Sequence, residues 1–480
     1  MLKRSIDNDL IEWKNREGHR PLVVSGLRQI GKTTSVRFFG EQNYKNVVYL
    51  DLRSDKTIHS VFDGDFSVDE MVLAITATDP KAVFEPYNTL VIMDEIQDCP
   101  NARSSLKYWS MDGRYDVIAT GSFLGVKGFR KPYTRGIPVG YEDRITMYPL
   151  TFEEFLENIG VQENVVDYVK KCIEDIKPVM QAVHDSMMNY YLQYLVVGGM
   201  PEAVNVFLST YDLNQVREVH RRTIESIKDD FGRYFNAKGE EKINEVLKLR
   251  AEACLNSLPA QLSKDYKKFQ YSLVDVKGHS PEKADGLQYL VDLGLVYKSF
   301  NTRELSTPLE ANKVDTEFKV FMADTGLLIS MLEQGTAAKV LAGDLSSYKG
   351  AIAENMVAVT FSSKSMPLYY YRSSNGSPEL DFIYSDNGDA VIIECKSNNN
   401  RPTSMKYVLA HPNKYGSHKG IKIANANIGR STEYSTYPLY ALCLLLNKPN
   451  QSIVTINDPT ELSRLLQDEM AEKIDEAGIE

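Results

Sequence analysis

The chain has 480 residues, 43% of them apolar, which is enough for roughly two to four domains with cores of their own. Its net charge of −10 excludes a protein-wide basic field, so any nucleic-acid role has to rest on local basic patches. Five scattered cysteines without a paired spacing, a charged N-terminus and only short apolar runs predict a soluble cytoplasmic protein with no membrane partner.

Residues 1–150 alternate short β-rich runs with helix-like stretches, which predicts a parallel sheet with crossover helices. The β-rich runs are PLVVSG from residue 21, NVVYLDL from 46, TLVIMDE from 89 and YDVIATGS from 115. We therefore expect an α/β fold for this part of the chain.

The first of these runs leads into GLRQIGKTT, a full match to the phosphate-binding pattern GxxxxGK[ST], and a helix-like stretch follows. In such a loop the glycines let backbone amides close around phosphate oxygens at the start of a helix. We expect Lys32 to reach the β- and γ-phosphates of ATP and Thr33 to bind Mg²⁺. The predicted nucleotide-binding residues are Gly26, Leu27, Arg28, Gln29, Ile30, Gly31, Lys32, Thr33 and Thr34. The alternative is an ordinary glycine-rich turn before a helix.

TLVIMDEIQD places two acids at the end of an apolar strand, next to the predicted loop. Asp94 is expected to hold Mg²⁺ and Glu95 to polarise the attacking water, although both acids would also suit a simple strand end. Ser122, or with less support Thr120, is a candidate contact to the γ-phosphate.

Hydrolysis also needs a cation on the charge that develops in the transition state. Arg144, Arg130 and Arg135 are the candidates for this arginine finger, and a surface-loop role is the alternative for each. Since sequence ties no arginine to the loop, we expect a neighbouring copy in a homo-oligomer to supply it.

Residues 151–240 are predicted to be helical, with GGMP separating two helices. Residues 241–340 are predicted to form a winged-helix-like domain, in which SPEKADGLQYLVDLG is a helix that leads into a strand. Three lysines of this part are candidates for phosphate contacts with DNA, while a solvated helix face is the alternative: Lys264, Lys267 and Lys268.

Residues 341–450 are predicted to be an α/β domain, followed by an acidic tail at 451–480. Within it, ELDFIYSDNGDAVIIECKSN reads as a β-hairpin whose Asn387-Gly388 turn pairs Asp386 with Asp389. The same register sets Asp381 opposite Glu394. Alternation then places Glu379, Asp381, Glu394 and Lys396 on one face, and Leu380, Phe382, Ile393 and Cys395 on the other.

Two opposed carboxylates about 5 Å apart at Cβ repel each other unless a cation lies between them. Glu354 lies on an apolar helix stripe with Val357 and Phe361, so its carboxylate also needs a partner. Glu354, Asp381 and Glu394 are therefore predicted ligands of Mg²⁺ or Mn²⁺, with Lys396 beside them to orient water or stabilise a phosphate. The alternative is a solvated hairpin with a Glu379–Lys396 pair.

The acids and lysine follow the pattern of PD-(D/E)xK nucleases, and the whole chain resembles a family of prokaryotic AAA-type ATPases with a C-terminal domain of unknown function. The motifs that carry this resemblance are VSGLRQIGKTT, VIMDEIQ, ATGS, YPLTFEEFL, YLVVGGMPEAV, FMADTGLL, GAIAEN, LYYYRSSNGSPELDF, IIECKS and YPLYAL. The resemblance implies an AAA-like P-loop core, a helical and winged-helix middle and a nuclease-like end. Family members usually have Gly-Arg where this chain has Asp143-Arg144.

These residues favour a DNA-associated ATPase with a nuclease-like C-terminal domain. The rival hypothesis is a nucleotide-dependent switch whose C-terminal part binds partners or DNA without cleaving.

Overall fold

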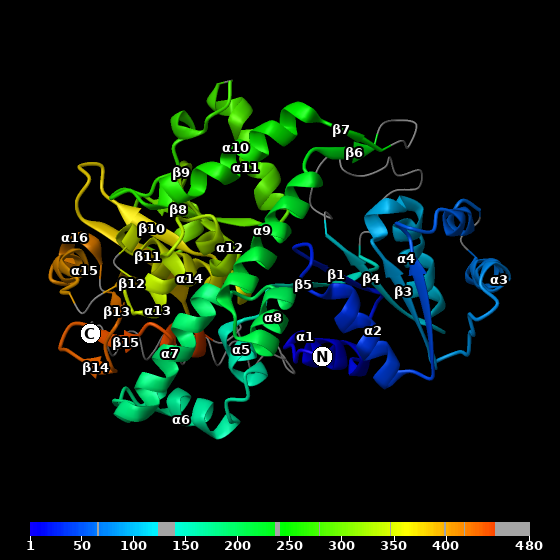
Figure 1. The fold of residues 1–480 in the computed structure, drawn as a ribbon, viewed down its shortest axis with the longest axis horizontal. Coiled ribbons are helices and arrows are strands. Elements are labelled where there is room, and N and C mark those ends of the chain that lie inside the picture. Colours follow the sequence, from blue (N-terminus) through cyan, green and yellow to red (C-terminus); the bar gives the residue numbers. More distant parts are fainter. Residues whose placement is uncertain are drawn as a thin grey trace, which may run out of the picture. The chain divides into compact units, whose positions relative to one another are not determined.

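In the computed structural model the N-terminal sheet has five parallel strands in the order β2-β3-β4-β1-β5 (Figure 1). The strands are β1 (Leu22–Gly26), β2 (Asn46–Asp51), β3 (Thr89–Asp94), β4 (Asp116–Gly121) and β5 (Asp143–Met147). The four predicted strands are confirmed, and β5 adds a parallel edge beside β1. This order brings the carboxyl ends of β1, β3 and β4 to one edge of the sheet, where ligands of such sheets bind.

Both faces of this sheet are covered, which explains the nearly continuous apolar runs of its strands. Leu22, Val24 and Ile92 pack into one core cluster, whereas Val23 and Val91 pack into another. The helices of this part are α1 (Ile6–Asn15), α2 (Lys32–Asn43), η1 (Thr57–Phe62), α3 (Val68–Thr78), η2 (Ile96–Asp98) and α4 (Pro100–Asp112). Residues of α1 and α2 belong to the first cluster and residues of α3 and α4 to the second.

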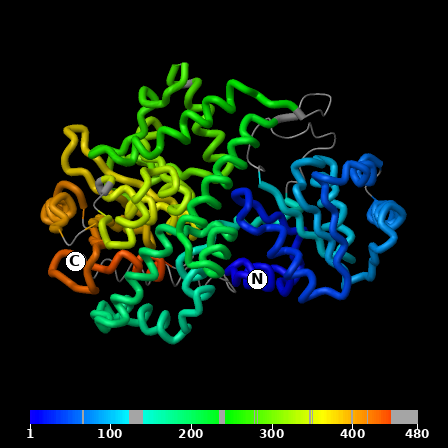
Figure 2. The backbone as a smooth tube through the Cα atoms, viewed as in Figure 1, coloured from blue at the N-terminus to red at the C-terminus, as the bar shows by residue number. Residues whose placement is uncertain are grey.

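A helical run follows, as predicted for residues 151–240, and forms the cyan-to-green part of the tube in Figure 2. Its helices are α5 (Phe152–Asn158), α6 (Glu163–Glu174), α7 (Gln181–Val197), α8 (Pro201–Thr210) and α9 (Leu213–Asp229). Thr151 and Glu154 form a reciprocal capping box at the start of α5. The segment Gly198–Met200 separates α7 from α8, where Pro201 occupies the first turn.

The next part contains α10 and α11, packed against each other, and the antiparallel pair β8–β9. Its elements are β6 (Arg233–Phe235), β7 (Glu241–Ile243), α10 (Glu245–Leu262), η3 (Tyr271–Leu273), α11 (Ser280–Asp292), β8 (Val296–Thr302), η4 (Leu309–Asn312), β9 (Lys313–Met322), α12 (Thr325–Ser330) and α13 (Thr336–Leu341). This is the element order expected of a winged helix, an assignment that stays a prediction.

The C-terminal sheet has eight strands in the order β14-β15-β13-β12-β11-β10-β8-β9. Its other elements are η5 (Ser347–Gly350), α14 (Ala351–Ser363), β10 (Tyr369–Arg372), β11 (Glu379–Asp386), β12 (Asp389–Lys396), α15 (Thr403–Leu409), α16 (Pro412–Tyr415), β13 (Lys419–Ala424), β14 (Gly429–Arg430), β15 (Ser435–Pro438) and α17 (Ala441–Leu445). Because β8 pairs in parallel with β10, hydrogen bonding crosses the domain boundary expected near residue 340.

The hairpin between β11 and β12 has the predicted register, with Asp386 opposite Asp389 and Phe382 opposite Ile393. Asn387 and Gly388 have φ values of 47° and 89°, as a two-residue turn of the primed type requires.

The predicted face of Leu380 is wrong. On the other side of β11, Tyr369 pairs with Ile383 but Tyr371 pairs with Leu380, so one extra residue is inserted in β11. This β-bulge interrupts the alternation, so that Leu380 packs with Ile383 while Phe382 packs in a different cluster.

The structure describes residues 1–64, 67–122, 140–235, 241–277, 279–345, 347–397, 400–416 and 418–446. The arginine-finger candidates Arg130 and Arg135 and the acidic tail lie outside these ranges. Residues Met1–Leu446 form one compact unit. Within the described ranges, no helix combines the length and the apolar character needed to cross a bilayer.

Candidate nucleotide site and C-terminal charge cluster

The loop from Gly26 to Gly31 connects the end of β1 to the start of α2, as the phosphate-binding pattern predicts. Gly26 has no room for a side chain, because a Cβ there would collide with the carbonyl oxygen of Met147 on β5. Gly31 is the N-cap of α2 with a φ of 89°, a conformation that glycine adopts without strain. The loop therefore needs both glycines for its shape.

Lys32 is 6% exposed, and its amine donates to the carbonyl oxygens of Gly26 and Leu27, at 3.1 and 2.8 Å. It also donates to the hydroxyl of Ser122, at 3.1 Å. Burial lowers the pKa of Lys32 to about 8, against the opposing pull of Glu95 and Asp94. The buried amine is therefore held at the loop by acceptors that a phosphate would supplement.

Asp94, at the end of β3, accepts hydrogen bonds from the hydroxyls of Thr33 and Tyr49. The distances are 2.9 Å from Thr33 Oγ1 and 2.7 Å from Tyr49 Oη, and Thr120 donates to the same carboxylate. A hydroxyl beside a carboxylate at a phosphate loop is a donor set that suits Mg²⁺. Thr33 and Asp94 thus fit the predicted metal role, whereas Thr120 is committed to Asp94.

Glu95 has a φ of 52°, unusual for a residue with a side chain, and is partly buried. Gln97 donates to the Glu95 carboxylate, and the backbone amide of Glu95 lies 3.2 Å from Asp94 Oδ1. The chain bends away from β3 immediately after Asp94, so the side chains of Asp94 and Glu95 contact different groups.

A cavity of about 760 Å³ lies over the loop. Its lining contains most of the predicted site together with residues of α8: Arg28, Gln29, Gly31, Lys32, Thr33, Thr34, Glu95, Ser122, Pro201, Glu202, Asn205, Val206 and Ser209. Leu27 and Ile30 point elsewhere and are buried in the core. The structure therefore brings Lys32, Thr33, Glu95 and Ser122 to one cavity of ligand size.

Asp230, just after α9, forms ion pairs with several arginines beside the phosphate loop. The carboxylate is 2% exposed and pairs with Arg28, with Arg233 at 3.0 Å and with Arg53 at 3.7 Å. Burial, reinforced by the neighbouring Arg53, lowers the pKa of Arg28. The hydrogen bond from Gln29 to Ser226 of α9 is a second link, at 3.1 Å. The helical run thus contacts the nucleotide loop directly.

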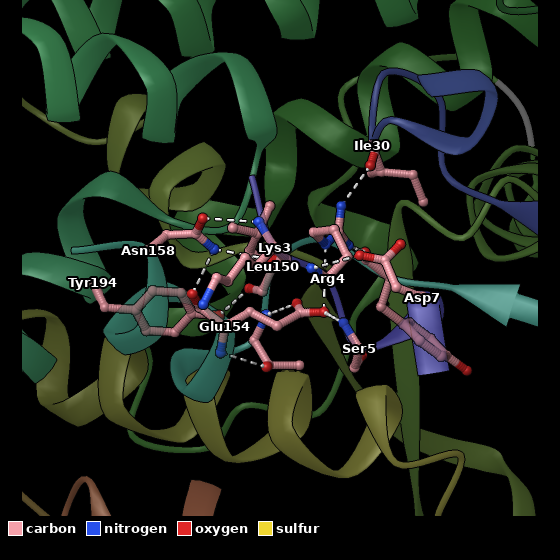
Figure 3. Close-up of polar contacts among 11 residues, drawn as sticks. Lys3, Arg4, Ser5, Asp7, Ile30, Leu150, Glu154, Asn158 and Tyr194 are labelled. Carbon is pink, nitrogen blue, oxygen red and sulfur yellow. Dashed lines mark hydrogen bonds and ion pairs between the residues drawn. The ribbon is translucent and has the colours of Figure 1, made fainter. Parts of the chain in front are cut away.

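Arg4 supplies a further link (Figure 3). Its guanidinium donates to the carbonyl oxygen of Ile30 at 2.9 Å and to that of Tyr148 at 2.6 Å, and it pairs with Glu154 at 3.4 Å. Glu154 also accepts from the backbone amide of Ser5, at 2.6 Å. The chain before α1 therefore joins the phosphate loop to the start of α5.

Arg144 lies on β5 and pairs with Glu142, while its side chain remains 64% exposed. Glu142 is also held by the buried Arg103, at 2.7 Å. Arg144 lines a second cavity, of about 360 Å³, together with Gly26 and Ser122. The arginine-finger role of Arg144 stays a prediction, and the structure places the residue at the strand edge beside its own loop.

At the C-terminal hairpin, Lys396 bridges the two opposed carboxylates, at 2.6 Å from Glu394 and 3.4 Å from Asp381. Glu394 is 1% exposed. Burial, together with the Asp381 charge, raises the pKa of Glu394 to about 8, whereas the cations of Lys396 and Lys319 hold the pKa of Asp381 low despite its burial. This environment favours the protonated form of Glu394 and the charged form of Asp381, with the Lys396 cation beside both.

Glu354 on α14 is buried, as predicted, and its partner is Lys267. Glu354 Oε1 pairs with the Lys267 amine, while Oε2 is buried without a hydrogen-bond partner among the described residues. In the described part of the chain, no three His, Cys, Asp or Glu side chains are grouped to hold a metal ion. The described structure does not group these three carboxylates around one position, and their role as metal ligands stays a prediction.

The suggested DNA contact of Lys267 is wrong, because its side chain is only 6% exposed and serves Glu354. Lys268 pairs with Glu317 at 2.8 Å, and Lys264 donates to the side chain of Gln270. The alternative of a Glu379–Lys396 pair is not found among the described residues, where Glu379 lies 3.6 Å from Lys319 and 3.7 Å from Arg372.

Comparison with known proteins gives three family-model matches along the chain. Residues 18–156 match the family model of an AAA domain. Two models of domains of unknown function, DUF8612 and DUF4143, match residues 188–338 and 349–442. No curated protein matches the chain.

Three solved structures are similar to parts of this chain. PCH-2 of C. elegans is 12% identical over 46% of this chain and 71% of its own, with a TM-score of 0.24. Unliganded Pif1 from Bacteroides sp is 16% identical over 39% and 52%, with a TM-score of 0.21. The RuvB Holliday junction branch migration motor of Thermotoga maritima is 14% identical over 62% and 90%, with a TM-score of 0.27.

Structural similarities with TM-scores this low carry no argument. The class of the N-terminal domain is therefore assigned from the family match, the strand order and the loop geometry. On those grounds residues 18–156 have the fold and the phosphate loop of an AAA-type P-loop domain.

Sequence reasoning missed Arg4, Tyr49 and Asp230, and it assigned Lys267 to DNA instead of to Glu354. Their contacts with Ile30, Asp94, Arg28 and Glu354 span large sequence separations, and only Tyr49, near the end of a predicted strand, carried a positional signal.

Proposed function

We propose that this protein binds ATP with Mg²⁺ and hydrolyses it, and that the nucleotide cycle acts on DNA. The observation that carries the proposal is the convergence of Lys32, Thr33, Glu95 and Ser122 on one cavity beside Asp94. Lys32 would neutralise the β- and γ-phosphates, while Thr33 and Asp94 would hold Mg²⁺. The metal supplies charge neutralisation to the transferring phosphoryl group. Glu95 lines the cavity and would orient and deprotonate the attacking water.

The test measures ATP binding by calorimetry and phosphate release with Mg²⁺. Lys32→Ala should abolish binding, whereas Glu95→Gln should retain binding and hydrolyse ATP at least about 100-fold more slowly. The Glu17→Gln change on the exposed segment after α1 is a matched control and should leave both unchanged. Equal turnover of the wild type and Glu95→Gln would remove Glu95 from the mechanism.

A homo-oligomer would complete the site if Arg144 of a neighbouring copy reaches the γ-phosphate. The exposure of Arg144 beside the loop supports this role. Mixing Arg144→Ala with Lys32→Ala protein should then restore part of the lost hydrolysis. A protein that stays monomeric with an ATP analogue at micromolar concentration would contradict the idea.

For the C-terminal part, with limits proposed at 341–450, we propose a PD-(D/E)xK nuclease-like arrangement. The confirmed hairpin register and the bridging position of Lys396 support it. The second candidate, a nucleotide-dependent switch that binds without cleaving, is favoured by the pairing of Glu354 with Lys267. Metal-dependent cleavage of plasmid and branched DNA, lost in Lys396→Ala, would favour the nuclease; intact DNA with Mg²⁺ and with Mn²⁺ would favour the switch.

A further inference from the structure

A cleft of about 860 Å³ opens where β8 and β9 meet the loop between β10 and β11. It is separate from the nucleotide cavity, which is lined by residues of the phosphate loop and α8. Its lining is Tyr266, Lys268, Asn301, Thr302, Arg303, Val314, Glu317, Tyr371, Arg372, Ser373, Ser374, Asn375, Gly376, Ser377, Lys414 and Tyr415.

The charge of this lining is opposite to that of the protein. Four basic side chains, from Lys268, Arg303, Arg372 and Lys414, face one acidic side chain, Glu317. The whole chain carries −10. Because Arg303 and Lys414 are exposed, the cleft is a local electropositive site of the kind that a polyanion needs on an acidic protein.

Aromatic rings lie among these cations. The Arg372 guanidinium lies 3.5 Å from the centre of the Tyr266 ring, and the Lys414 amine lies 5.0 Å from that of Tyr415. A guanidinium packed this closely over an aromatic ring offers planar groups on which an unpaired base stacks. Duplex DNA keeps its bases inside the helix, so this mixture of cations and aromatic faces fits a single strand better than a duplex.

The cleft also reaches the C-terminal charge cluster through Glu379. One carboxylate oxygen lies 3.7 Å from Arg372 in the cleft, and the other lies 3.6 Å from the buried Lys319. Lys319 in turn acts on the charge of Asp381. Glu379 therefore links the lining of the cleft to Lys319, whose charge lowers the pKa of Asp381.

We propose that this cleft binds single-stranded DNA, with Arg303, Arg372 and Lys414 on its phosphates and the Arg372–Tyr266 pair under a base. This inference rests on the proposed association with DNA. It adds that the DNA is single-stranded and that it binds in this cleft.

The test titrates the full-length protein into a fluorescent 20-nucleotide DNA strand at several salt concentrations. The double variant Arg303→Ala/Lys414→Ala should weaken binding and lower the slope of log K against log salt by about 1.4, for two lost phosphate contacts. Arg372→Lys keeps the charge but loses the planar group, so it should weaken binding about tenfold with little change in slope. Lys177→Ala removes one charge from a lysine that is 71% exposed outside the cleft, and as the control it should leave binding nearly unchanged. ATP binding by each variant shows that the fold is intact.

Each other outcome overturns the inference in a distinct way. If the wild type binds the strand and the double variant binds it equally well, the cleft is wrong and the association with DNA stands. If the wild type binds no DNA, the inference fails together with the DNA part of the proposed function, while the ATPase test is unaffected. Tighter binding of the duplex or of a single RNA strand overturns the assigned ligand. Equal competition by polyphosphate of the same charge overturns the stacking role.

Discussion

Replacing Lys267 by Met removes the cation that neutralises the buried carboxylate of Glu354. The two side chains are only 6% and 8% exposed, and one carboxylate oxygen has no other partner among the described residues. Burial by itself would lower the pKa of Lys267, but the Glu354 charge and hydrogen bond outweigh it and raise this pKa, which favours a charged Lys267 amine. Breaking a buried pair from one side costs about 3–5 kcal/mol, because the remaining charge stays buried.

This cost converts into a modest change in melting temperature because the folded unit, Met1–Leu446, is large. An unfolding entropy of about 2.1 cal/mol/K per residue gives about 0.9 kcal/mol/K for the unit. The Lys267→Met protein should therefore melt about 3–5 °C below the wild type if the unit unfolds cooperatively. Scanning calorimetry measures this difference directly.

The neighbouring Lys268 provides the matched control, since its side chain is 29% exposed and its pair with Glu317 lies nearer the surface. Lys268→Met should lower the melting temperature by less than about 1 °C. The double variant Lys267→Met/Glu354→Gln should recover most of the loss, because two neutral groups replace the broken pair. If Lys267→Met melts like the wild type, or if the double variant is as unstable as the single one, the pair does not stabilise the fold as argued.

Three further outcomes are expected. Because burial lowers the pKa of Lys32 to about 8, ATP affinity measured by calorimetry should fall by up to about tenfold per pH unit above pH 8. The Lys32→Arg variant should show a flat affinity profile over pH 7–9, and a flat wild-type profile would contradict this reasoning. Arg4→Met should destabilise the protein by about 2–3 kcal/mol, because Glu154 and the Ile30 carbonyl lose a charged donor, whereas removal of the exposed Lys3 amine by Lys3→Met should change the melting temperature little. Mn²⁺ should raise the melting temperature of the wild type and should raise that of Asp381→Asn much less. If neither melting temperature shifts, no metal binds at these acids. A larger shift in Lys267→Met than in the wild type would show that Lys267 competes with the metal.

The sequence by itself determined features that depend on local chemistry. The four apolar runs became neighbouring strands because their residue types suit a sheet that is buried on both faces. The glycines at 26 and 31 gave the phosphate loop its position, since few other residues permit that backbone. The register of the β11–β12 hairpin followed from Asn387 and Gly388, because a two-residue turn leaves no freedom to slip.

The tertiary structure decided which charges meet. Lys267 precedes Glu354 by 87 residues and Arg4 precedes Glu154 by 150, and nothing local to either residue indicates its partner. The bulge in β11 depends on its pairing with β10, so sequence alternation alone placed Leu380 on the wrong face. A buried carboxylate requires a counter-charge, which the sequence could state for Glu354, but several cations satisfy that requirement and only packing selects one. The folded chain places Lys267 at Glu354 and Lys396 at Glu394, while the metal predicted from these acids stays a prediction.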